Sequence, residues 1–179
     1  LSMYTRFIAG LTAAAILVPP LALAQAQGSE NGAGIDYDTA RHERRLKASQ
    51  AQGRIELDGR LDEAHWRTVP AATDFTQTEP ADGAPATERT EVYIVYDDDA
   101  IYVGARLWDS GDVTSRLARR DSYITDSDWF YVMFDSHHDH LNAYMFSVNP
   151  AGVKRDERSS GGEPDDSWDA IWDVATSID

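Results

Sequence analysis

Three histidines and two aspartates lie close together in the stretch FDSHHDHLNAY, between Asp135 and His140. Imidazole nitrogens and carboxylate oxygens are ligands for zinc and related transition metals. A zinc site, however, usually draws its ligands from several segments and needs a second shell to orient them. Because strand-like sequences flank this stretch on both sides, we expect His137, His138 and His140 to lie at the exposed tip of a hairpin. The favoured interpretation is a solvated loop, and a metal site is the alternative.

Catalytic motifs are absent from the sequence, which has no HExxH helix, GxSxG elbow, P-loop or GxGxxG turn. Glycoside hydrolysis needs two carboxylates about 5 to 9.5 Å apart across a cleft. With 31 Asp and Glu residues, some pair will satisfy that distance by chance. We therefore predict no catalytic residues and no enzyme activity in this chain, which leaves open that it is part of a larger carbohydrate-active protein.

Size and composition predict one domain with a real core, because the chain has 179 residues of which 42% are hydrophobic. Its formal net charge of −15 argues against binding to nucleic-acid phosphates or anionic lipid. The chain has no cysteine, so disulfides, thiolate sites and a lipid-anchored N-terminal cysteine are excluded.

Residues 1–26 have the features of a secretory signal peptide. Arg6 precedes the apolar run FIAGLTAAAILV, and the small-residue segment LALAQA follows it, with cleavage expected after Ala24 or Ala26. The run is shorter than the roughly 20 residues that span a membrane. We therefore predict export to the periplasm, to the outer membrane or to the medium.

After the signal peptide, residues 27–52 are polar and predict a linker, and residues 53–179 form the predicted domain. In GRIELDGRLDEAHW, we expect Leu61 and Trp66 to face inward from one helical turn. Alternating apolar residues in TEVYIVYDDDAIYVGARLWDS predict a β-hairpin with a tight turn at DDDA.

A second hairpin is predicted from DWFYVMFD and NAYMFSVNP. Both faces of residues 129–134 are apolar, which predicts a strand buried inside a sandwich. Short strands separated by turn signals predict an all-β fold, an antiparallel β-sandwich.

The same motifs, in the order IELDGRLDEAHW, TERTEVYIVYDDDAIYVGARLWDS, RRDSYITDSDWFYVMFDSHHD, AYMFSVNPAGVKRDE and SWDAIWD, resemble the family 9 carbohydrate-binding module. The chain is more closely similar to the N-terminal module of large exported bacterial proteins whose downstream region is thought to form an outer-membrane β-barrel. The resemblance covers residues 53–179. It implies a jelly-roll-like sandwich, carbohydrate binding and structural calcium.

Two features depart from that family. Its sugar-binding members hold a sugar between two tryptophans; the first position is Thr125 here, and the second lies beyond Asp179. The ending WDVATSID reads as the beginning of a strand, and the family continues with strands that close the sheet. We therefore expect the chain to be a fragment that lacks its last strands.

Sugar recognition needs aromatic faces beside planar hydrogen-bonding groups, because sugar rings have apolar faces and hydroxylated edges. Trp66 and Trp172 are expected in the core, since they end an amphipathic turn and begin a strand. An Arg fork before the long strand would suit sugar hydroxyls. The candidate carbohydrate-binding residues are Trp108, Trp129, Trp168, Arg119, Arg120 and Asp121.

Acidic residues are concentrated in the second half, where residues 97–179 contain 16 Asp and two Glu against seven Lys or Arg. Carboxylates in loops suit calcium, although no DxDxDG pattern occurs and a solvated acidic surface is the alternative. The candidate calcium ligands are Asp126, Asp128, Asp156, Asp165, Asp166 and Asp169.

These observations favour a non-catalytic carbohydrate-binding module of an exported cell-envelope protein, which binds plant-type or envelope polysaccharide. Its expected partners are an oligo- or polysaccharide and the downstream part of its own polypeptide, an outer-membrane barrel by resemblance. Two alternatives stay open: a structural or plug-like domain that packs on that barrel without binding sugar, and the targeting module of a glycoside hydrolase. Thr125 in place of a tryptophan favours the structural alternative.

Overall fold

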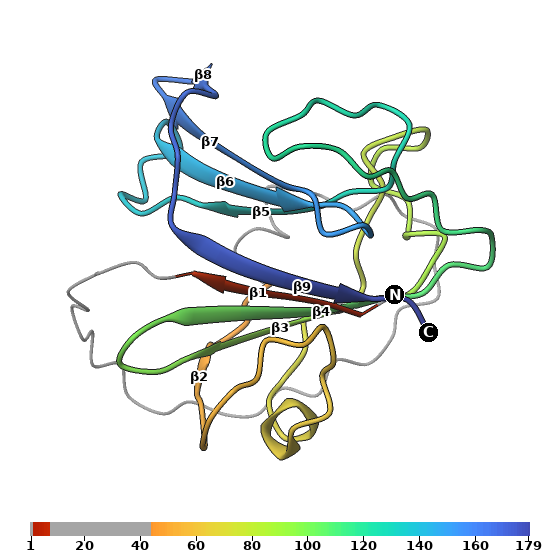
Figure 1. The fold of residues 1–179 in the computed structure, drawn as a ribbon, viewed down its shortest axis with the longest axis vertical. Helices are drawn as coiled ribbons and strands as arrows, with labels where there is room; N and C mark the ends of the chain where they lie inside the picture. The colour runs from red at the N-terminus through yellow and green to blue at the C-terminus, as the bar shows by residue number, and fades with distance from the viewer. Residues whose placement is uncertain (1, 8–43) are drawn as a thin grey trace.

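Two facing β-sheets make up the fold in the computed structural model, which describes residues 2–7 and 44–179 (Figure 1). Residues 8–26 of the predicted signal peptide, which contain most of its apolar run and both cleavage sites, lie outside the described residues, as does most of the predicted linker. Residues 2–7 of the same segment form a strand that lies between two others in one sheet. The strands are β1 (Ser2–Phe7), β2 (Ser49–Gln50), β3 (Thr90–Tyr96), β4 (Ile101–Leu107), β5 (Phe130–Phe134), β6 (Ala143–Val148), β7 (Lys154–Ser160), β8 (Glu163–Asp165) and β9 (Trp172–Ser177), with a 3-10 turn η1 (Ala64–Arg67).

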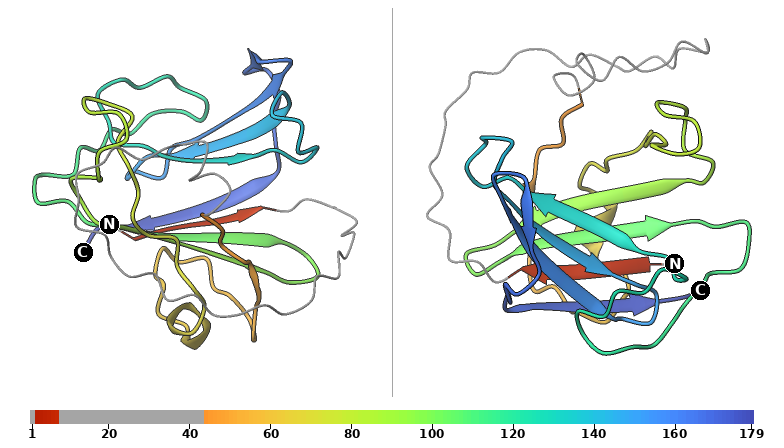
Figure 2. Two further views of the ribbon diagram at one scale, coloured as in Figure 1. Left: turned by 180° about the vertical axis from the view of Figure 1, so that it is seen from behind. Right: turned by 90° about the horizontal axis from the view of Figure 1, so that it is seen from above.

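One sheet has five strands in the order β2-β3-β4-β1-β9, and the other has four in the order β5-β6-β7-β8. Among the described strands the pairs are antiparallel, apart from the parallel pair of β2 with β3. Seen from above, the strands of the four-stranded sheet run obliquely across those of the five-stranded sheet (Figure 2). The predicted all-β sandwich is confirmed. The described residues include no helix long and apolar enough to cross a membrane.

The core lies on both faces of the five-stranded sheet. Between the sheets, Val103 and Ala105 of β4 pack with Phe146 and Val148 of β6 and with Trp172 of β9. On the opposite face, below β3 and β4 in Figure 1, η1 and the chain before it cover a second cluster. Because alternate residues of a strand point to opposite faces, β4 contributes to both clusters. The second cluster consists of Leu61, Trp66, Tyr93, Val95, Ala100 and Tyr102.

Both predicted hairpins are confirmed, with β3 paired to β4 and β5 paired to β6. The prediction that residues 129–134 form a strand buried on both faces was wrong. β5 is an edge strand of its sheet, and Tyr131 and Met133 are 51% and 64% exposed. The apolar pattern on both faces was misleading because only one face of this sheet has another sheet to pack against.

The β5–β6 loop is organised by Asp139. Its carboxylate accepts hydrogen bonds from the backbone N–H groups of Leu141 (2.9 Å) and Asn142 (2.8 Å) and from the Asn142 side chain (2.6 Å). The Asn142 side-chain bond and these backbone bonds lower the pKa of Asp139 to about 2. The loop therefore has a defined conformation, although it is exposed.

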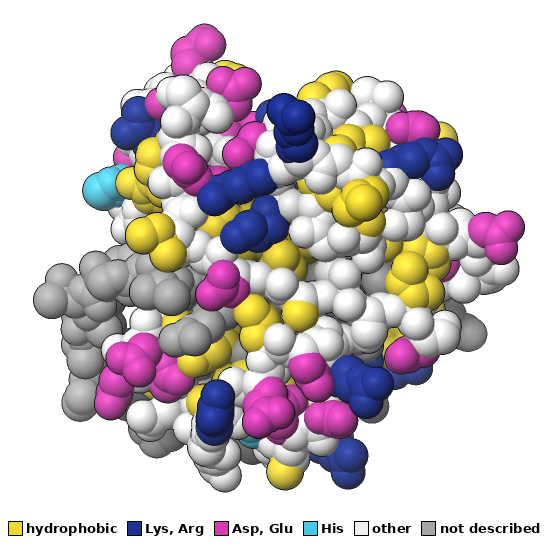
Figure 3. All heavy atoms as spheres, in the orientation of Figure 1, with side chains coloured by type: hydrophobic (Ala, Val, Ile, Leu, Met, Phe, Trp, Pro, Cys, Tyr) yellow, Lys and Arg dark blue, Asp and Glu magenta, His cyan; other side chains and the backbone are white. Residues whose placement is uncertain are grey.

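Acidic and basic side chains are mixed on the surface despite the net charge. In Figure 3, Lys and Arg side chains lie among Asp and Glu side chains in both the upper and the lower part of the visible face. The high content of carboxylates is thus distributed over this face rather than collected at one place.

Gly59 lies against the last strand and cannot carry a side chain without a clash. Its φ is +85°, and a Cβ there would come within 2.7 Å of the Thr176 backbone carbon. We expect Gly59→Ala to reduce the free energy of unfolding by about 2 kcal/mol, from left-handed strain and overpacking. Gly53→Ala is the matched control, because Gly53 has a φ of +103° and nothing near its Cβ position. Equal losses for the two variants in urea unfolding would contradict the close approach to β9.

Candidate functional site

A cleft lies where the end of β4 meets the start of β5, so both sheets contribute to it. Its lining includes Trp108, which follows β4, and Trp129, which precedes β5, and its volume is about 200 Å³. Sequence analysis selected these two tryptophans separately. The structure brings them to one cleft because they lie at the two ends of one connection, residues 108–129, which leaves β4 and enters β5 at the same end of the sandwich.

The two tryptophans are held differently. Trp108 is 40% exposed, and the Arg89 guanidinium lies 4.4 Å from its ring centroid, within cation–π distance. Trp129 is partly buried, and its indole N–H donates to the Ile124 carbonyl at 2.9 Å. One edge of Trp129 is therefore fixed by the loop, and the cleft has an apolar wall made of side chains that are already ordered.

Three carboxylates stand among the lining residues, those of Glu88, Asp109 and Asp128. Each accepts a hydrogen bond from within the protein: Glu88 from the Ser110 hydroxyl, Asp109 from the Gly111 backbone (2.7 Å) and Asp128 from the Thr114 backbone (2.7 Å). A carboxylate has about four lone-pair positions, so each of them retains acceptor capacity. The cleft thus combines indole rings with oriented acceptors for hydroxyl groups.

Asn149 positions the loop that forms one side of the cleft, and sequence analysis did not single it out. Its side chain is fully buried and donates to the Arg116 carbonyl at 2.6 Å and to the Ser127 hydroxyl at 3.2 Å. Its own side-chain oxygen accepts the Val153 N–H at 2.9 Å. The Asn-Pro pair that follows β6 is typical of a turn. It did not reveal that the amide reaches a distant loop.

Arg120 lies at the edge of the core and is surrounded by carboxylates of the protein itself. It donates to Asp156 at 2.6 Å and also pairs with Asp121 and Asp169. Burial opposes the positive charge, but the hydrogen bond and charge of Asp156 outweigh it, so the pKa of Arg120 is raised. This guanidinium is thereby committed to an internal network.

The remaining sugar-binding candidates lie outside the cleft lining. Trp168 packs on the core, with its ring 4.9 Å from that of Tyr144 and 5.9 Å from that of Phe146. Arg119 is exposed, and Thr125, at the expected tryptophan position, is also exposed. Of the predicted set, Trp108 and Trp129 line the cleft, and Arg120 and Asp121 pair with each other elsewhere.

The six aspartates proposed for calcium lie in separate places. Asp126 pairs with Arg116 and Asp165 with Arg158, while Asp128 lines the cleft and Asp166 is exposed next to Asp165 in the chain. Asp156 and Asp169 surround Arg120. A group of three potential metal ligands, with donor atoms within 4.8 Å of one another, occurs among residues 2–7 and 44–179. It contains none of these six aspartates. They therefore do not form one cluster of ligands.

Calcium prefers six to eight oxygen ligands around one ion. The cation that Asp156 and Asp169 enclose is instead the Arg120 guanidinium. Comparisons of the chain with family models, with curated proteins and with solved structures found no match.

Proposed function

We propose that the chain is a non-catalytic carbohydrate-binding module, and that its sugar site is the cleft lined by Trp108 and Trp129. The observation that carries the proposal is the meeting of two indole rings and three carboxylates in one cleft. Aromatic rings contact the apolar faces of sugars, and carboxylate oxygens accept hydrogen bonds from sugar hydroxyls. This is the combination that sugar recognition requires.

The size of the cleft favours a single sugar unit. Its volume of about 200 Å³ lies below the range of roughly 300 to 1,000 Å³ typical of pockets for drug-sized ligands. We therefore propose recognition of one residue of an oligo- or polysaccharide, with the rest of the chain remaining in solvent. The same proposal includes export of the chain through its N-terminal signal. It also includes a relationship of residues 53–179 to the family 9 module, which they resemble in sequence.

The structural or plug-like alternative also has support in particular contacts. Arg89 already lies against the Trp108 ring, and the Arg120 network uses residues first considered for sugar binding. A protein of that kind would fold cooperatively and bind no sugar. The two functions therefore give opposite results in a binding experiment.

Calorimetric titration with xylan, cellulose and mannan oligosaccharides tests the proposal. We expect saturable binding of one of them, and a loss of affinity of about tenfold or more in Trp108→Ala and in Trp129→Phe, since tenfold corresponds to about 1.4 kcal/mol. Phenylalanine rather than alanine is chosen at position 129 because its ring still fills space next to Ile124, to whose carbonyl the Trp129 indole donates. Glu88→Gln should weaken binding less, because the amide oxygen still accepts one hydrogen bond.

Tyr96→Ala is the matched control, because Tyr96 is 42% exposed, close to the 40% of Trp108, and does not line the cleft. Its affinity should equal that of the unmodified chain. A cooperative thermal transition that no sugar shifts would exclude the binding module and support the structural domain, because ligands that bind the folded state raise the midpoint.

A further inference from the structure

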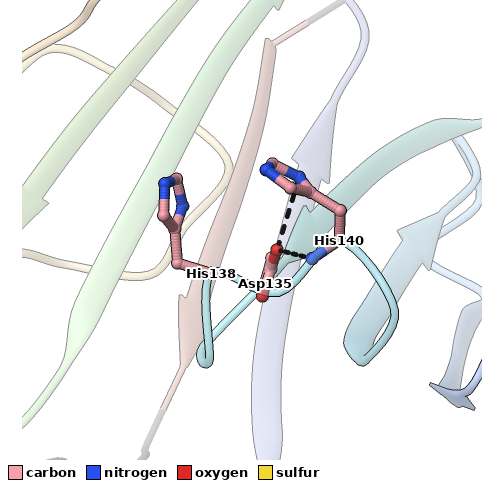
Figure 4. Close-up of side chains that lie close together, drawn as sticks. All are labelled: Asp135, His138 and His140. Carbon is pink, nitrogen blue, oxygen red and sulfur yellow. Dashed lines mark hydrogen bonds and ion pairs between the residues drawn. The ribbon is translucent and has the colours of Figure 1, made fainter.

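The loop between β5 and β6 begins at the other end of β5 from the cleft, and it brings one carboxylate and two imidazoles together. Asp135, His138 and His140 each offer a ligand atom, and these atoms all lie within 4.8 Å of one another. In Figure 4 the His138 and His140 side chains rise on the same side of the loop, with Asp135 between their bases. The sequence suggested His137, His138 and His140 as ligands, whereas the group in the structure contains Asp135 and not His137.

Backbone conformation explains why these two histidines converge. His138 and His140 have φ values of 53° and 58°, in the left-handed region that few residues other than glycine adopt. Their ring centroids lie 5.2 Å apart. The loop conformation thus directs alternate imidazoles to one side.

Asp135 is the anchored member of the group. Its carboxylate accepts the backbone N–H of His140 at 2.8 Å and that of Asp139 at 3.2 Å, and its Oδ2 lies 3.7 Å from Nδ1 of His140. Hydrogen bonds of this kind orient a ligating carboxylate. With two of about four lone-pair positions used, the carboxylate still has room for a metal.

The ligand chemistry distinguishes among metals. Calcium and magnesium take oxygen ligands, whereas imidazole suits zinc, copper and nickel. Metal–ligand bonds of roughly 2.0 to 2.2 Å place two ligand atoms of a tetrahedral zinc about 3.4 Å apart. The exposed imidazoles reach that spacing by rotating their side chains. Two imidazoles and one carboxylate leave the remaining coordination positions to water or to an external ligand.

We propose that Asp135, His138 and His140 form a binding site for a single divalent transition-metal ion of the zinc, nickel and copper class. The site is separate from the proposed sugar cleft and does not depend on it. Because both histidines stand in solvent, binding is expected in the micromolar range rather than with the affinity of a buried structural zinc site.

Calorimetric titration of the untagged full chain with zinc chloride, nickel chloride and calcium chloride tests the site. We expect one zinc or nickel ion per chain, no uptake of calcium at this site, and a rise of the thermal midpoint with zinc. His138→Asn and His140→Asn should each weaken zinc binding roughly tenfold or more. Asparagine is the replacement of choice because it tolerates the left-handed conformation while removing the imidazole.

His137→Asn provides the matched control, since His137 belongs to the same exposed loop but not to the group. It should leave zinc affinity within about threefold of the unmodified chain, a change below about 0.7 kcal/mol. The proposal is overturned if zinc shows no saturable one-to-one binding. It is equally overturned if His137→Asn weakens zinc binding as much as His138→Asn and His140→Asn do. For this comparison each variant must keep, without metal, the thermal midpoint of the unmodified chain.

Discussion

Asp156→Ala is expected to lower the free energy of unfolding by about 3 kcal/mol, because it leaves charged and polar partners unpaired at the core. The Asp156 side chain is 1% exposed and accepts hydrogen bonds from Arg120 (2.6 Å), from the Trp172 indole (3.0 Å) and from the Ala170 backbone (2.6 Å). Removal of one partner of a buried pair typically costs about 3 to 5 kcal/mol. We expect the lower end because the Arg120 side chain is 34% exposed, so water compensates in part.

Urea unfolding followed by tryptophan fluorescence measures the loss. Asp126→Ala is the matched control, since Asp126 pairs with Arg116 where both side chains are exposed, and such pairs contribute about 0 to 1 kcal/mol. The double variant Arg120→Leu with Asp156→Leu should be more stable than Asp156→Ala, because it leaves no unpaired charge in the core, and the Asp121 and Asp169 carboxylates that lose Arg120 are exposed to solvent. Equal stability of Asp156→Ala and Asp126→Ala would show that the Arg120 network is not part of the folded core.

Trp66→Ala should destabilise the fold at least as strongly, by about 3 to 5 kcal/mol, because it empties the centre of the second cluster. Trp66 is fully buried beneath the five-stranded sheet. Its ring and that of Tyr93 are arranged edge to face, with 6.1 Å between their centroids. Its indole N–H also donates to Glu63 at 2.8 Å, a bond that alanine cannot make. The segment around η1 would then lose the contact that holds it to β3 and β4.

The same unfolding experiment on Trp108→Ala supplies the comparison, because that tryptophan lies at the surface and its removal should cost less than about 1 kcal/mol. Trp66→Phe should fall between the two, since phenylalanine fills part of the space. If Trp66→Ala and Trp108→Ala had similar midpoints, η1 would not pack on the sheet in the way that the structure describes.

Local alternation of apolar residues was sufficient to predict the two hairpins, because side chains on a strand alternate between faces with a period of two. The inward positions of Leu61 and Trp66 followed from an amphipathic turn, and that of Trp172 from its place at the start of a strand. All three are buried. The same local argument failed for β5, because burial of a face depends on whether a second layer covers it.

The candidate site, like the fold, could be predicted from the sequence only in part. Residue type selected Trp108 and Trp129, since an indole ring suits a sugar face, but it equally selected Trp168, which packs on the core. Their meeting in one cleft depends on the path of residues 108–129, the connection from β4 to β5 that the two tryptophans begin and end, and Asn149 helps to hold that connection. No local pattern carries information about such a contact.

The class of fold, the two hairpins and the burial of Trp66 and Trp172 could be predicted from the sequence, because each depends on short-range alternation and on turn chemistry. The partners of the polar side chains could not be predicted in this way. The tertiary structure paired Arg120 with Asp156 across 36 residues, and it chose Asp135 rather than His137 as the neighbour of His138 and His140. The physical reason is that charge pairing and ligand convergence depend on distance in space, which the packing of the two sheets and the path of the loops set.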